Sequence, residues 1–157
     1  MNILFVCKYN RFRSRVAEAY FKEINKNKHL QAMSAGIIRG DYPLNRTEVS
    51  AAKKLGIDIS GKPLAIDVDL LKRTDLVIIV ADNVPKEIFY TTFNKRVILW
   101  RISDIECGDG KDLIERKIKI IMSKVKKLLK KLEKESFRRK LELNKKKAKE
   151  DHLNGRR

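Results

Sequence analysis

The run of apolar residues from Leu76 to Val80 is the feature that most constrains the fold of this chain. It reads Leu-Val-Ile-Ile-Val, and a short apolar run without polar alternation is typical of a strand buried on both faces. Such strands occur in parallel sheets, because the crossover connections between parallel strands place helices over both sides. The sequence therefore predicts an α/β fold in three layers.

The rest of the chain alternates between strand and helix patterns. The strands are expected at 2–6, 31–35, 75–80 and 96–99, and the helices at 13–27, 45–55, 67–72, 84–88 and 110–133. This order indicates a central four-stranded parallel sheet with helices on both faces. Ligands of such sheets bind at the carboxyl ends of the strands, so the residues that follow the strands are candidates for a functional site.

Residues 7–14 follow the first expected strand and lead into the first expected helix. They read Cys-Lys-Tyr-Asn-Arg-Phe-Arg-Ser. A strand that turns sharply into a helix directs loop amides and the positive end of the helix dipole at one point, where an oxyanion can bind. A cysteine there is expected to be a thiolate, which is a good nucleophile.

Each polar residue of this loop suits a step of phosphoryl transfer. Cys7 would attack phosphorus, and Arg13 would hold two equatorial oxygens with its planar fork of donors. Ser14 can donate its hydroxyl to the sulfur, and Asn10 suits a left-handed position in the middle of the loop. Taken alone, the Cys-x5-Arg spacing is a weak signal, since cysteine is more often a small buried hydrophobe.

The loop resembles the signature of the low-molecular-weight protein tyrosine phosphatases, which is Cys-x-x-Asn-x-x-Arg-Ser after a short strand. Further resemblance lies at residues 33–36, 51–60, 74–82 and 102–104, so that it covers residues 1 to about 133. The resemblance implies a phosphatase loop after the first strand, and hydrolysis of phosphotyrosine or small aryl phosphates through a phosphocysteine intermediate. It also implies binding of inorganic phosphate or other oxyanions, and no cofactor.

The resemblance assigns further roles around the loop. Asp104 falls where the family carries its general acid, which would protonate the departing phenolic oxygen. The alternative interpretation of Asp104 is an acidic residue of an ordinary turn with no catalytic role. Ser34 and Asp82 would support the site, although Asp82 also suits the N-cap of the helix expected at 84–88. The residues expected to surround the substrate are Lys8, Tyr9, Asn10, Arg11, Phe12 and Ser14.

The chain departs from the family pattern in two places. Tyr9 stands where the family usually has glycine, and a left-handed φ at a tyrosine would cost about 1 kcal/mol or more. Lys8, Arg11 and Phe12 stand where small or apolar residues are usual. After Asp104, the usual proline and the aromatic pair that walls the substrate ring are absent. The motif alone therefore does not determine the backbone geometry of the loop.

Three functions are compatible with these residues. The first is the phosphatase. The second is an arsenate reductase on the same fold. The thioredoxin-coupled reductases use two further cysteines beyond the central strand, but residues 81–87 contain none, and Cys107 alone could make at most one bridge to Cys7, which weakens this hypothesis. The third is a non-catalytic phosphate-binding module or basic adaptor. The threonine associated with phosphoarginine phosphatases is replaced here by Arg11.

Positive charge is concentrated at the C-terminal end. Residues 124–157 hold fifteen Lys or Arg and five Asp or Glu, and so carry +10 of the formal net charge of +17. An apolar stripe formed by Val125, Leu128, Leu129 and Leu132 is expected to pack on the domain. We therefore expect a domain over 1–133 and a basic extension, helical or disordered, over 134–157. A solvated tail is the default, and nucleic acid or an acidic surface is the alternative partner.

Compartment and metal content follow from simpler observations. No apolar run approaches the roughly 18 residues of a membrane span, and the chain opens directly on a strand. Cys7 and Cys107 are too few for a disulfide framework. A cytoplasmic protein with reduced thiols is expected. His29 and His152 lie far apart in the sequence, so no metal site is expected.

Overall fold

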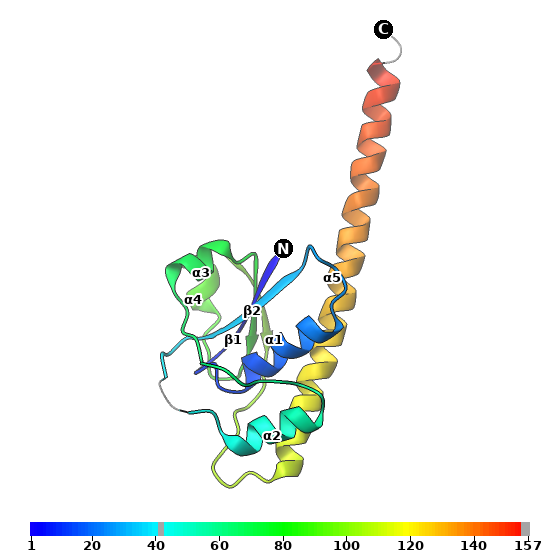
Figure 1. The fold of residues 1–157 in the computed structure, drawn as a ribbon. Helices are drawn as coiled ribbons and strands as arrows, with labels where there is room; N and C mark the ends of the chain where they lie inside the picture. Colours follow the sequence, from blue (N-terminus) through cyan, green and yellow to red (C-terminus); the bar gives the residue numbers. More distant parts are fainter. Residues whose placement is uncertain (41–42, 155–157) are drawn as a thin grey trace. The chain divides into compact units, whose positions relative to one another are not determined.

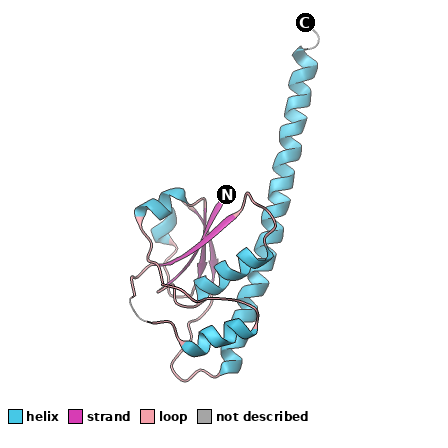
Figure 2. Cartoon of the chain, in the orientation of Figure 1, coloured by secondary structure: helices cyan, strands magenta, loops and turns pink. Residues whose placement is uncertain are grey.

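The computed structural model of the chain describes residues 1–40 and 43–154. It contains one parallel sheet with the strand order β2-β1-β3-β4. The strands are β1 (Asn2–Cys7), β2 (Gln31–Gly36), β3 (Leu76–Val80) and β4 (Arg96–Trp100). The helices are α1 (Arg13–Ile24), α2 (Arg46–Lys54), α3 (Val68–Arg73), α4 (Glu87–Tyr90) and α5 (Lys111–Asn154) (Figure 1; Figure 2). The predicted four-stranded parallel sheet is confirmed.

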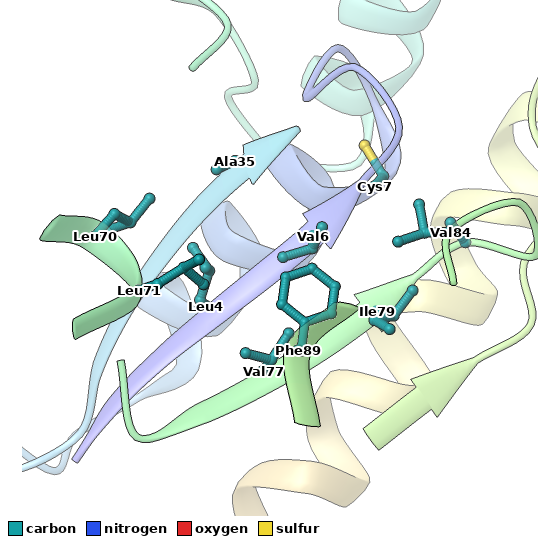
Figure 3. Packing of buried hydrophobic residues seen from close by; sticks show 11 residues of the cluster. Leu4, Val6, Cys7, Ala35, Leu70, Leu71, Val77, Ile79, Val84 and Phe89 are labelled. Atoms are coloured by element: carbon teal, nitrogen blue, oxygen red, sulfur yellow. The ribbon is translucent and has the colours of Figure 1, made fainter. Parts of the chain in front are cut away.

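Helices cover both faces of the sheet, because the inner strands are apolar at successive positions. On one face, Leu4 of β1 belongs to a buried cluster with Leu71 of α3 and Phe89 of α4 (Figure 3). On the other face, the Phe5 ring lies 5.9 Å from the Phe21 ring of α1, measured between centroids. Residues adjacent in a strand point to opposite faces, and burial of both faces confirms the predicted three-layer architecture.

The carboxyl ends of the strands lie along one edge of the sheet. Cys7 is the last residue of β1 and pairs with Gly36 at the end of β2. Beyond β3 and β4, the Asp82 amide donates to the Ile102 carbonyl at 3.1 Å. The residues that follow three different strands are thereby brought together, as expected of parallel strands.

Among the four shorter helices, two boundaries lie three residues from their predicted positions, and the last helix continues past the predicted residue 133 to Asn154. The first helix ends at Ile24 instead of residue 27, because Asn25 has an extended backbone with ψ of 119° and its side-chain amide donates to the carbonyls of Asn27 and Leu30. The fourth helix begins at Glu87 instead of residue 84. Val84 belongs to the buried core cluster, so the chain packs inward before it turns into the helix.

The chain divides into two units, Met1–Val125 and Lys126–Arg157. In the second unit, the described residues are helical as far as Asn154, and large apolar side chains such as Phe137 and Leu143 are exposed. The expected extension is therefore helical over its described part. The boundary predicted at residue 133 stays a prediction. In the part of the chain that the structure describes, no helix is long and apolar enough to cross a membrane.

Gly36 is required by the close approach of β2 to the loop after β1. A Cβ at this position would lie 2.7 Å from the Tyr9 carbonyl carbon and 2.8 Å from the Asn10 nitrogen. Both atoms belong to the backbone and cannot move without displacing the loop. We expect Gly36→Ala to lower the free energy of unfolding by roughly 2–3 kcal/mol, as measured by urea denaturation.

Gly110→Ala is the matched control for Gly36→Ala. A Cβ at Gly110 meets nothing within 4 Å, and the backbone there is not left-handed. This substitution should change the free energy of unfolding by less than about 1 kcal/mol. Equal effects of the two substitutions would contradict the crowding argument.

Candidate active site

The loop between β1 and α1 is held in place by Asn10. This residue is fully buried and has a φ of 53°, the left-handed backbone expected of it from the sequence. Its side-chain oxygen accepts from the Leu64 amide at 2.9 Å. Its side-chain nitrogen donates to the hydroxyls of Ser14 at 2.9 Å and Ser34 at 2.8 Å. Asn10 thus joins the loop to α1, β2 and the segment before α3.

These bonds determine the direction of the hydrogen bond at Cys7. The Cys7 Sγ lies 3.0 Å from the Ser14 Oγ. Because the Leu64 amide can only donate, the carboxamide oxygen of Asn10 must face it, and the nitrogen must face the two serines. The Ser14 oxygen therefore accepts from Asn10, and its single hydrogen is available for the sulfur. The Ser34 hydroxyl in turn donates to the Glu18 carboxylate.

Arg13, the first residue of α1, is 1% exposed. Its guanidinium donates to the Ile102 carbonyl at 2.8 Å and to the Asp104 carboxylate at 2.8 Å. It also donates to the Asn83 side chain at 3.2 Å, and one of its nitrogens lies 3.5 Å from an oxygen of Asp82. The arginine is therefore oriented by the segments that follow β3 and β4.

The interpretation of Asp82 as a helix N-cap is wrong. The helix α4 begins at Glu87 with Lys86 at its N-cap position, and no side chain caps it. Asp82 instead lies beside Arg13. Because Val84 packs into the core between Asp82 and the helix, the carboxylate is left at the edge of the sheet. There it faces the guanidinium.

Asp104 lies on a loop that Lys117 of α5 anchors. The Lys117 ammonium donates to the Ser103 hydroxyl at 2.8 Å and to the Ser103 carbonyl at 3.1 Å, and it also donates to the Asp104 carbonyl. Sequence reasoning missed this lysine. Its spacing from Ile114, Ile118 and Ile121, which are all buried, places it on the inward face of an amphipathic helix. A charged residue at such a position is a signal that could have identified it.

A pocket of about 350 Å³ opens over Cys7. The predicted residues that line it are Cys7, Tyr9, Arg11, Phe12, Arg13 and Asp104. The lining residues that the sequence analysis did not assign to the site are Asn45, Glu48, Ile105, Glu106 and Cys107. The predicted residues that do not line it are Lys8, Asn10, Ser14, Ser34 and Asp82. Asn10, Ser14 and Ser34 lie behind the pocket, in the hydrogen-bonded chain around the sulfur.

The unusual loop residues fit without backbone strain at Tyr9. Among the described residues other than glycine, only Asn10 and Asn94 have a positive φ, so Tyr9 pays no left-handed penalty. The Lys8 ammonium lies 4.9 Å from the centre of the Tyr9 ring, as a cation–π contact. The Arg11 guanidinium donates to the Pro43 carbonyl at 2.7 Å. The departures from the family pattern therefore alter the rim of the pocket.

Glu48 is an unexpected acid in this pocket. It is 9% exposed, and burial raises its pKa to about 7, with a smaller contribution from the Asp104 carboxylate. Arg11 and Arg13 act in the opposite direction and lower it. On sequence alone, Glu48 is an ordinary acid in the first turn of a helix. Its spacing from the apolar Ala51 and Ala52 was the available sign of burial.

No metal-binding cluster occurs within residues 1–40 and 43–154, because no group of three or more His, Cys, Asp or Glu side chains in that part of the chain could hold an ion. Cys7 and Cys107 are both free thiols, the first buried and the second exposed. The pocket therefore presents a buried thiol, an exposed thiol, two arginines and three carboxyl groups.

A sequence profile described as low molecular weight phosphotyrosine protein phosphatase matches residues 2–140. The chain belongs to this family. The family resemblance inferred from the loop motif is thereby confirmed over most of the chain.

Individual relatives within or near the family have two different activities in their names. An arsenate reductase from Halalkalibacterium halodurans is 32% identical over 111 residues, which cover 70% of this chain and 78% of the relative. The structure of a low-molecular-weight protein tyrosine phosphatase from T. tengcongensis is 27% identical with a TM-score of 0.70, covering 83% of this chain and 99% of that one. Membership of the family therefore indicates an enzyme but leaves the reaction to be inferred from the site.

An arginine phosphatase from Geobacillus stearothermophilus has the same fold, with a TM-score of 0.73 and 16% identity. The matched region covers 87% of this chain and 96% of the arginine phosphatase chain. This likeness supports the family fold alone.

Proposed function

We propose that this protein is a phosphatase that hydrolyses phosphotyrosine-type phosphate monoesters through a phosphocysteine intermediate. The observation that carries the proposal is the directed hydrogen bond from Ser14 to Cys7, in a pocket that also contains Arg13 and Asp104. A hydroxyl that donates to sulfur stabilises the thiolate as nucleophile and, later, as leaving group. A site that only bound phosphate would have no use for it.

The arrangement supports a two-step reaction. In the first step, the Cys7 sulfur attacks phosphorus, the bond to the ester oxygen breaks, and Asp104 gives that oxygen a proton. In the second step, Asp104 takes a proton from water, the water oxygen attacks phosphorus, and the sulfur leaves as a thiolate. Arg13 would exchange its contact with Asp104 for the equatorial oxygens of the phosphoryl group.

The experiment that tests this proposal combines turnover with detection of the intermediate. The full chain is assayed with p-nitrophenyl phosphate at mildly acidic to neutral pH, and an acid-quenched sample is examined by intact-protein mass spectrometry for a phosphate on Cys7. We expect turnover and a phosphorylated cysteine. Absence of turnover with the thiol shown to be reduced would overturn the proposal.

Asp104→Asn should lower kcat about 10²–10³-fold, because an amide cannot protonate the leaving group. The size of the loss depends on that leaving group. p-Nitrophenolate leaves readily without a proton, whereas phenolate does not. We therefore expect a larger loss of kcat/KM with phenyl phosphate than with p-nitrophenyl phosphate, because hydrolysis of the phosphocysteine is the same step for both substrates and only kcat/KM reports departure of the leaving group. Steady-state kinetics on both substrates measure it.

Glu106→Gln is the matched control for Asp104→Asn, since Glu106 is an exposed carboxylate that lines the same pocket. It should change kcat less than about threefold on either substrate. An equal loss of kcat/KM on both substrates in Asp104→Asn would contradict the role of Asp104 as proton donor to the leaving group.

Arsenate reduction is the second candidate, because Cys107 lines the same pocket as Cys7. In this reaction the Cys107 thiolate attacks the sulfur of a Cys7–arsenate adduct, so that a disulfide forms and the electron pair of the broken sulfur–arsenic bond leaves with arsenic as arsenite. An external thiol must then reduce the disulfide. Arsenite release that is lost in Cys107→Ser would support this candidate, and phosphatase turnover that survives the same change would support the first.

The proposed chemistry needs Cys7 in its reduced form, which fits a reducing compartment such as the cytoplasm. Phosphorylated proteins or small aryl phosphates are the proposed substrates. The binding of nucleic acid or an acidic surface by the basic extension over 134–157 stays a prediction from charge.

A further inference from the structure

The active-site pocket contains a buried carboxyl group that the proposed reaction does not use. Glu48, in the first turn of α2, lines the pocket with Cys7, Arg13 and Asp104 and is only 9% exposed. An ionised carboxylate in such a place is costly unless cations compensate it. The cations available to it are those that would bind an oxyanion, so the two negative groups compete.

Several elements bring charged or titratable groups to the same pocket. Those from β1 and its loop, α1 and the loop after β4 are Cys7, Tyr9, Arg11, Arg13, Asp104, Glu106 and Cys107. Of these, the two arginines favour the ionised form of Glu48, and Asp104 opposes it. A bound dianion would add two further negative charges beside Glu48 and so favour its neutral form.

We propose that Glu48 is a specificity-determining residue that couples oxyanion binding to the uptake of one proton. The pocket binds the oxyanion when Glu48 is a neutral carboxylic acid, and binding weakens as this group ionises. In the neutral form, the carboxyl removes a repulsion and can also donate a hydrogen bond to an oxygen of the anion. The proposal rests on the proposed function in one respect, since it requires an oxyanion at Arg13.

A further observation supports this coupling. Burial raises the pKa of Glu48 to about 7, so its change of charge falls close to neutral pH. Asp104 also lines the pocket and contacts Arg13 at 2.8 Å, a contact that an oxyanion at Arg13 would replace. The Glu48 substitution therefore distinguishes proton uptake at Glu48 from proton uptake at Asp104.

The test measures sulfate binding by isothermal titration calorimetry at about pH 6 and about pH 8, a range in which sulfate itself remains a dianion. The starting variant is Cys7→Ser, so that titration of the thiol does not contribute. Glu48→Gln is then added, and Glu106→Gln is added separately as the control for an exposed pocket acid. Two buffers with different ionisation enthalpies give the number of protons taken up. A thermal melt of each variant checks folding.

In Cys7→Ser, we expect the sulfate Kd to rise about tenfold from the lower to the higher pH, with uptake approaching one proton at the higher pH. The Glu106→Gln addition should leave this behaviour unchanged. With Glu48→Gln, the Kd should change less than about twofold. A carboxyl with only a structural role would alter the affinity equally at both pH values.

Three outcomes would overturn the coupling. One is the absence of proton uptake in Cys7→Ser. This measurement does not use the Glu48→Gln substitution, so it tests the coupling even if Cys7→Ser/Glu48→Gln does not fold. Another is a pH dependence that persists in Cys7→Ser/Glu48→Gln. Absence of sulfate binding at both pH values in every folded variant would overturn the proposed oxyanion site itself, and the coupling with it.

Discussion

Cys7→Ser is expected to lower kcat/KM for p-nitrophenyl phosphate by at least about 10⁴-fold. A serine hydroxyl at neutral pH is a far weaker nucleophile than a thiolate, and the phosphocysteine intermediate cannot form. The substitution is nearly isosteric, and the Cys7 sulfur has the Ser14 hydroxyl as a hydrogen-bond partner that an oxygen can also use. The loss should therefore reflect chemistry, with the thermal midpoint of unfolding almost unchanged.

The same variant separates an enzyme from a non-catalytic binding module. The measurement pairs steady-state kinetics with sulfate binding on Cys7→Ser and on the wild-type chain. We expect turnover to vanish while sulfate still binds, because Arg13 and the loop amides remain. Wild-type turnover that survives within tenfold in Cys7→Ser would show that Cys7 is not the nucleophile. A wild-type chain that binds sulfate with no turnover would favour the binding module.

Arg13→Lys is expected to lower kcat/KM by about 10³-fold or more. The Arg13 guanidinium donates to the Ile102 carbonyl and the Asp104 carboxylate at the same time, and this orientation presents a planar fork to the pocket. A lysine ammonium is a point charge with no paired parallel donors, so it cannot hold two equatorial oxygens in fixed geometry. The decrease should appear mainly in kcat, because the equatorial oxygens separate further in the transition state.

Arg15→Lys is the matched control, since Arg15 lies on the same helix but donates to the carbonyls of Ile59 and Lys62, away from the pocket lining. It should keep kcat/KM within about tenfold of wild type. Steady-state kinetics and a thermal melt on both variants make the comparison. Equal activity of Arg13→Lys and the wild-type chain would contradict the role given to the guanidinium.

The sheet and the position of the site were predictable from the sequence for a simple reason. In a strand such as residues 76–80, successive side chains point to opposite faces and all of them are apolar, so both faces must be covered to remove them from water. Once the strands are parallel, their carboxyl ends share one edge, so Cys7 and Asp104 were expected to converge although they lie far apart in the chain. The left-handed position of Asn10 was likewise a local property, because asparagine tolerates that backbone.

The helix ends were less predictable, because they depend on competition between local and distant contacts. Asn25 ends α1 through side-chain bonds to the turn that follows it. Val84 delays α4, because its burial in the core outweighs the helix start expected at residue 84. Hydrophobic periodicity indicates which face of a helix or strand is apolar. It does not indicate the residue at which contacts with another segment end the helix.

The sequence by itself determined the parallel sheet, the position of the loop at residues 7–14 and the family motif within it, since these follow from short-range patterns of residue type. Only the tertiary structure decided that Glu48 shares the pocket, that Lys117 anchors the loop of Asp104, and that Asp82 faces Arg13. The physical reason is that desolvation and charge pairing depend on which distant segments surround a side chain. The sequence shows that a residue carries a carboxyl group, but it does not show whether water or two arginines lie beside that group in the folded chain.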